Sequence, residues 1–79
     1  MPAGMLRIGR SSDNDLVLGD TKVSRYHAQL TARQGALVFT DLGSSNGSQV
    51  GGARVSEMAL GPGDVIRIGD STITIANAG

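Results

Sequence analysis

Short apolar runs, each ended by a turn residue, are the feature that most constrains how this chain folds. The runs have three to six residues, and most of them alternate apolar with polar positions, as in Met5–Ile8, Ala28–Ala32 and Leu37–Thr40. Alternation with a period of two places every second side chain on one face of a β-strand. No stretch keeps a helical period for ten residues. The pattern therefore predicts an all-β chain.

The glycines between the runs agree with this prediction. Gly51-Gly52 suits a two-residue type I′ hairpin, and Gly69-Asp70 suits type II′. Gly61-Pro62-Gly63-Asp64 has proline and glycine where a type II turn prefers them, and Gly35 permits another reversal. The further strands are expected at Leu16–Leu18, Val50, Ala53–Val55, Met58–Leu60, Val65–Ile68 and Thr72–Ala76. Of these, we expect Leu16–Leu18 to be a short buried run. We expect a twisted antiparallel β-sandwich of about ten short strands.

Composition excludes several classes of function. Cysteine is absent and there is one histidine, so no disulfide, thiolate chemistry or cysteine-based zinc site is available, and we expect no cofactor and no metal. Seven basic and seven acidic residues cancel, which predicts no nucleic-acid or membrane partner. No apolar run approaches the length of a membrane span, and no signal peptide is evident, which favours a cytoplasmic protein.

The length predicts one domain over residues 1–79, with its core at about 6–76, because no linker or repeat divides the chain. The aromatic residues are only Tyr26 and Phe39. We therefore expect Val, Ile, Leu and Met to fill the core.

Three polar clusters adjoin the apolar runs: Gly9-Arg10, Ser24-Arg25-Tyr26-His27 and Ser44-Ser45-Asn46-Gly47. Arginine forms bidentate charge pairs with phosphate, and serine and asparagine supply hydrogen-bond donors. The clusters contain no obvious nucleophile–base pair. They predict a protein that binds a phosphate group.

These clusters, in this order, resemble the forkhead-associated (FHA) domain. The resemblance rests on Ile8-Gly9-Arg10, on Val23–Ala28, on Asp41–Ser48 and on Leu60–Gly69, and it extends from about Leu6 to Ile75. It implies a β-sandwich that binds phosphothreonine peptides with loops at one end. The function expected is a phosphothreonine-dependent module that recruits partner proteins phosphorylated by a Ser/Thr kinase.

The resemblance assigns roles to eight residues. The positions that correspond to phosphate contacts are Arg10, Ser24, Arg25 and Ser45, and Asn46 corresponds to a contact with the peptide backbone. The positions with structural roles are Gly9, His27 and Gly47. We expect the His27 ring to be buried, with a nitrogen bonded to a backbone group that fixes the Ser24 loop. We expect Asp15 to bond nearby backbone.

The chain departs from the family pattern in several places. Ser45 stands where threonine is usual, Tyr26 where a basic residue is frequent, and Gly51 where asparagine often precedes glycine. Family members usually carry another strand before the one that ends at Gly9. We expect either that this chain lacks it or that the true start of the chain lies further upstream. A neighbouring strand would then have unpaired backbone groups, which predicts a monomer of marginal stability or weak self-association.

Two other functions fit parts of the pattern. Ser24 and His27 with Asp41 or Asp64 would supply the groups of a hydrolase triad, but Ser24 lies in no Gly-x-Ser-x-Gly elbow, so we expect no enzyme. A phosphate-independent protein–protein module on the same fold is the alternative. It would need damaged phosphate donors, and here the donors are intact.

Overall fold

The computed structural model describes residues 4–76 and contains no helix among them, so none that could cross a membrane. Its nine strands are β1 (Met5–Gly9), β2 (Leu16–Val17), β3 (Ala28–Arg33), β4 (Ala36–Asp41), β5 (Ser48–Val50), β6 (Ala53–Val55), β7 (Glu57–Leu60), β8 (Val65–Ile68) and β9 (Ser71–Thr74). The all-β prediction is confirmed, with nine strands in the described residues where about ten were expected.

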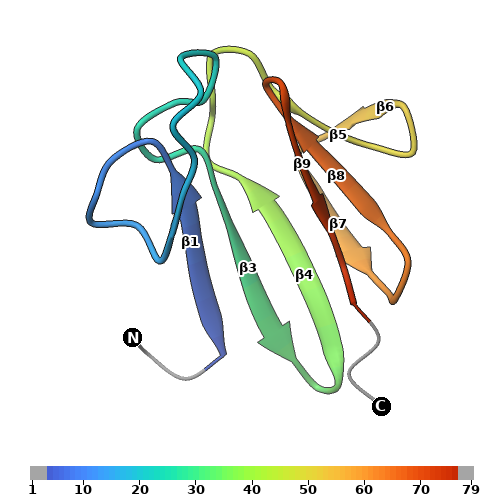
Figure 1. Ribbon diagram of the computed structural model, residues 1–79. Helices are drawn as coiled ribbons and strands as arrows, with labels where there is room; N and C mark the ends of the chain where they lie inside the picture. The colour runs from blue at the N-terminus through green and yellow to red at the C-terminus, as the bar shows by residue number, and fades with distance from the viewer. Residues whose placement is uncertain (1–3, 77–79) are drawn as a thin grey trace.

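The strands form two sheets (Figure 1). One sheet has five strands in the order β2-β1-β3-β4-β7, and the other has four in the order β6-β5-β8-β9. All pairs are antiparallel except β1 with β2, which is a parallel pair of two residues. The connections that follow β1, precede β3 and precede β5 lie at the same end of the sheets, at the top of Figure 1.

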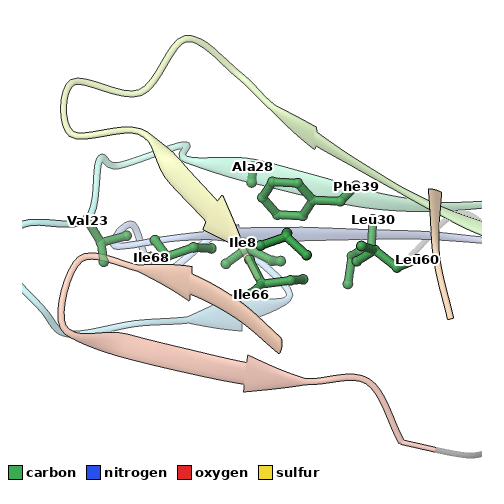
Figure 2. Packing of buried hydrophobic residues seen from close by; sticks show 9 residues of the cluster. Ile8, Val23, Ala28, Leu30, Phe39, Leu60, Ile66 and Ile68 are labelled. Carbon is green, nitrogen blue, oxygen red and sulfur yellow. The ribbon is translucent and has the colours of Figure 1, made fainter. Parts of the chain in front are cut away.

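The core lies between the two sheets, as Figure 2 shows. Its buried side chains are Ile8, Val23, Ala28, Leu30, Phe39, Val50, Leu60, Ile66 and Ile68. The two-residue alternation explains its members in the first sheet, because Ile8 lies opposite Ala28 and Leu30 lies opposite Phe39 in the strand register. Complete burial of a side chain such as Phe39 contributes roughly 1.5–3 kcal/mol to stability.

The turns have the backbone that their sequences predict. Gly51 and Gly52 have φ of 61° and 83°, as a type I′ hairpin requires. Gly63 has φ of 90°, and the N–H of Asp64 donates to the carbonyl of Gly61 at 3.2 Å, which closes a type II turn.

Two predictions about burial are wrong. Leu16–Leu18 is not a buried run, because the edge strand β2 leaves Val17 48% exposed and the flanking leucines are half-buried. Methionine does not fill the core in the described residues. Met5 pairs with Thr31 on the outer face of the first sheet, and Met58 is exposed on the edge strand β7.

Candidate functional site

The three polar clusters lie in loops at one end of the sandwich, at the top of Figure 1, beside the β8–β9 hairpin. The first loop follows β1, the second precedes β3 and the third precedes β5. Backbone hydrogen bonds join the first two, since the N–H of Arg10 donates to the carbonyl of Ser24 at 3.0 Å and that of Ser11 to the carbonyl of Arg25 at 3.2 Å. Residues far apart in the sequence therefore meet around one surface.

Arg10 is exposed, and its guanidinium is held by one bond to the protein. Its Nε donates to the carbonyl of Val23 at 3.0 Å. The Nη groups make no hydrogen bond or ion pair within residues 4–76. The side chain is thus fixed over the Ser24 loop with donors left for an anion.

Ser24, Ser45 and Asn46 are brought together by contacts between the second and third loops. The backbone N–H of Ser45 donates to Oγ of Ser24 at 3.2 Å, so the hydroxyl hydrogen of Ser24 remains available to a ligand. The amide of Asn46 donates from Nδ2 to the carbonyl of Lys22 at 2.8 Å. Both contacts orient polar groups of one loop against the other.

Arg25 has an exposed side chain that makes no hydrogen bond or ion pair in the described part of the chain. Its backbone is packed more tightly. A Cβ on Gly9 would lie 2.1 Å from the carbonyl oxygen of Arg25, a distance that no side chain tolerates. The absence of a side chain at Gly9 therefore allows the end of β1 to touch the second loop.

His27 is completely buried and bridges the second and third loops. Its Nδ1 accepts the backbone N–H of Ser24 at 3.1 Å, so the ring carries its proton on Nε2, which donates to the carbonyl of Gly47 at 3.0 Å. The hydroxyl of Ser24 does not meet the ring. Asp41 lies 3.6 Å from Nε2, beyond a hydrogen bond. These three residues therefore lack the geometry of a catalytic triad.

Asp41 organises the third loop, and its role was not predicted. Its carboxylate accepts the N–H groups of Gly43 and Ser44 at 2.9 and 2.8 Å, and the hydroxyls of Ser44 and Ser48 at 2.6 Å each. Burial acts to raise the pKa of Asp41, but the hydrogen bonds from Ser44 and Ser48 outweigh it, and the pKa lies below the ordinary value. The sequence signal for this role is an aspartate followed by glycine and serine two and three residues later, because an Asp side chain in a turn accepts backbone N–H groups at those positions.

Two other polar residues join segments in ways that short-range patterns do not reveal. Asp20 accepts the N–H of Lys22 at 2.9 Å and that of Asp70 at 2.5 Å, which ties the second loop to the β8–β9 hairpin and lowers the pKa of Asp20. Asn14 is buried and donates to the carbonyls of Ser11 and Arg25 at 2.9 and 2.7 Å.

Side-chain hydrogen bonds to Asp13 and Asp15 also hold the first loop in place. The hydroxyl of Tyr26 donates to Asp13 at 2.7 Å, and the hydroxyl of Ser11 donates to the same carboxylate. These bonds from Ser11 and Tyr26 lower the pKa of Asp13. Asp15 accepts the backbone N–H of Arg7 at 2.9 Å.

Within residues 4–76, no group of three His, Asp or Glu side chains is arranged to hold a metal ion.

Comparison with known proteins places this geometry in one family. A family model described as FHA domain matches residues 6–69. The ABC transporter ATP-binding/permease protein Rv1747 of Mycobacterium tuberculosis is 42% identical over 77 residues, which is 98% of this chain and 9% of the relative. The chain thus spans a small part of the length of this relative.

Two solved structures superpose closely. An FHA domain from a structural and functional analysis of phosphothreonine-dependent FHA domain interactions has a TM-score of 0.92 and 38% identity, covering 100% of this chain and 82% of that one. Mycobacterium tuberculosis EmbR in complex with a low-affinity phosphopeptide has a TM-score of 0.86 and 40% identity, covering 100% of this chain and 22% of that one.

Proposed function

The chain belongs to the FHA domain family, and from this premise we propose that it is a phosphothreonine-dependent peptide-binding module that recruits partner proteins phosphorylated by a Ser/Thr kinase. The observation that carries the proposal is the set of unused donors around one surface. The Nη groups of Arg10 and the hydroxyl of Ser24 come from different loops and are oriented by bonds to the protein. A phosphate dianion has three strong acceptor oxygens that such donors surround.

The proposed role of each residue is the one that its matching position in the FHA motifs implies. Arg10, Ser24, Arg25 and Ser45 bind the phosphate, and Asn46 binds the peptide backbone beside it. Gly9, His27 and Gly47 shape the loops, supported by the close approach at Gly9 and by the two ring nitrogens of His27 that bond both loops. We assign no catalytic step to the chain, since Ser24 and His27 lack triad geometry. Residues 6–76 are the proposed folded unit.

The test is a titration with two matched peptide pools that contain either phosphothreonine or threonine at one fixed position among degenerate flanks. We expect binding of the phosphorylated pool only, and free phosphothreonine should compete. Equal binding of both pools would support a phosphate-independent module instead. Release of inorganic phosphate or peptide cleavage would support an enzyme.

The pH dependence of binding provides a second readout. The second pKa of a phosphate monoester is about 6, and the site should prefer the dianion, so affinity should weaken as the pH falls through about 6. A phosphonate peptide with a different second pKa should move the midpoint. An unmoved midpoint would show that a group of the protein, rather than the phosphate of the ligand, sets the pH dependence.

A further inference from the structure

The outer face of the four-stranded sheet carries an unbalanced row of charge next to the proposed phosphate site. Gln49 of β5 lies between Arg54 of β6 and Arg67 of β8, and Arg67 pairs with Thr72 of β9. All four side chains are exposed, while their neighbours Ser48, Ile66 and Ile68 face the core. The row therefore presents two guanidinium groups and no carboxylate.

The corresponding row on the five-stranded sheet is balanced. It consists of Arg7, Gln29, Thr40 and Glu57, and the hydroxyl of Thr40 donates to Glu57 at 3.2 Å. In a chain with no net charge, the row on the four-stranded sheet is thus a local basic excess.

Both arginines of the basic row incline toward the loop end of the sandwich. A Cβ on Gly47 would lie 2.6 Å from Nε of Arg54, so this side chain covers the turn that presents Asn46. The Nε of Arg67 makes a long hydrogen bond of 3.5 Å to the carbonyl of Gly69 in the β8–β9 hairpin. The row is continuous with the phosphate site rather than separate from it.

A cleft of about 390 Å³ connects the two regions, with Asn46, Gln49, Arg67 and Lys22 among its lining residues. Lys22 is paired with Asp70 at 3.1 Å. Neither Arg54 nor Arg67 has a carboxylate within ion-pair distance in residues 4–76. The unpaired charge in this cleft comes from Arg67, with Arg54 beside it across Gln49.

We propose that the Arg54–Gln49–Arg67 row extends the peptide site and binds carboxylate side chains in the partner segment that flanks the phosphothreonine. This inference rests on the proposed phosphothreonine binding and names its partner as an acidic segment. Strand spacing puts the two arginines about 10 Å apart, which about three residues of extended peptide cover. Arg67 is the main anchor because it lines the cleft.

The experiment uses four peptides and five proteins. Two phosphothreonine peptides differ only in their flanks, with Asp and Glu in one replaced by Asn and Gln in the other, and each has an unphosphorylated match. The proteins are the unaltered chain, Arg67→Gln, the charge reversal Arg67→Glu, Arg54→Gln and the control Arg33→Gln. Arg33 is an exposed arginine at the far end of β3. Affinities are measured by calorimetry at low and high salt.

We expect the unaltered chain and Arg33→Gln to prefer the acidic phosphopeptide about five-fold, a typical size for a few exposed charge pairs. Arg67→Gln should reduce that preference below about two-fold, with a smaller reduction in Arg54→Gln, and high salt should reduce it in every protein. Affinity for the neutral phosphopeptide should not change. The charge reversal Arg67→Glu should favour the neutral phosphopeptide.

Two results would overturn the inference while leaving the proposed function intact. One is equal affinity of the unaltered chain for the acidic and neutral phosphopeptides. The other is an equal loss for both peptides in Arg67→Gln, which would assign Arg67 a role in the fold. Equal affinity for the phosphorylated and unphosphorylated forms of both peptides would instead contradict the proposed function.

Discussion

The loop end of the sandwich, which carries the three polar loops, is built differently from the tight turns at Gly35, Gly51-Gly52 and Gly61–Asp64, which together we call the hairpin end. The glycines make the difference plain. At the hairpin end, a Cβ on Gly52 would meet nothing within 4 Å, so glycine is needed there only for its φ of 83°. At the loop end, Gly9 has an ordinary φ, and a Cβ would collide with the carbonyl of Arg25. The hairpin end is held by local backbone conformation, whereas the loop end is held by packing between distant segments. Only the second arrangement fixes donors from several loops in advance of a ligand.

The largest expected effect is on binding at the loop end. Arg10→Ala should lower affinity for a phosphothreonine peptide by about 2–4 kcal/mol, because it removes a charge-assisted pair and leaves the phosphate without that partner. Melting should change little, since the side chain is exposed and makes one bond to the protein. Calorimetric titration and thermal unfolding measure the two quantities. Arg33→Ala at the hairpin end is the matched control, and retained affinity in Arg10→Ala would remove Arg10 from the site.

Replacement by alanine should lower the free energy of unfolding more at Gly9 than at Gly52. Gly9→Ala should destabilise the fold by about 2–3 kcal/mol, because the backbone of two segments must separate. It should also weaken peptide binding by moving the Arg10 and Ser24 loops. Gly52→Ala should cost about 1–2 kcal/mol from its positive φ alone and leave peptide affinity unchanged. Equal costs with equal affinities in chemical denaturation and titration would contradict the distinction between the two ends.

Asp41 makes the loop end sensitive to acid. Its folded-state pKa is lowered, so its contribution to stability is present above the ordinary carboxyl pKa of about 3.9 and is lost as the pH falls toward the folded value. Asp41→Asn should cost roughly 1.5–3 kcal/mol at neutral pH, the size of hydrogen bonds to a charged group. Urea unfolding between pH 3 and 7 should show a smaller acid-induced loss in the variant. An identical loss in both proteins would place the acid sensitivity elsewhere.

The same contrast explains what the sequence was able to predict. The turns at Gly51-Gly52 and Gly61–Asp64 were predicted correctly, because the φ that each requires is a local property of glycine and proline. Strand positions followed from alternation for the same reason. The prediction that Leu16–Leu18 is buried is wrong because burial depends on which strand lies at a sheet edge, and no local sequence pattern determines that.

The connections at the loop end were harder to predict. Asp20 bonds the N–H of Asp70, fifty residues later, and Asn14 bonds the carbonyl of Arg25. Such contacts depend on the complete fold, so only the motif residues, known by resemblance, indicated where the loops meet. The burial of His27 was expected, but its second bond, to Gly47, joins loops that the sequence separates by twenty residues.

Preorganised loops should also distinguish ligands that differ by one methyl group. The resemblance to FHA domains implies a small apolar pocket for the threonine methyl. One methyl contributes about 1 kcal/mol by transfer, so phosphothreonine should bind roughly five-fold more tightly than phosphoserine. Paired titrations of peptides that differ only at this residue measure the ratio. A ratio of one would mean that this chain does not share the family's methyl pocket.

The smallest effect is expected at Gly51, where glycine is needed only for its backbone conformation. A Cβ there would meet nothing within 4 Å, and the φ of 61° lies in the left-handed region that asparagine enters more readily than other residues. Gly51→Asn should therefore change stability by less than about 0.5 kcal/mol, since Asn-Gly is a favoured type I′ pair and a free surface position tolerates substitution. Peptide affinity should also be unchanged. Gly51→Val tests whether backbone conformation is the cause, because a β-branched residue rarely adopts a positive φ. This variant should destabilise the fold. The fraction of the protein that remains folded should bind the peptide with unchanged affinity. If either substitution weakened binding by the folded protein, the two ends would be coupled, and local conformation would no longer account for the hairpin end.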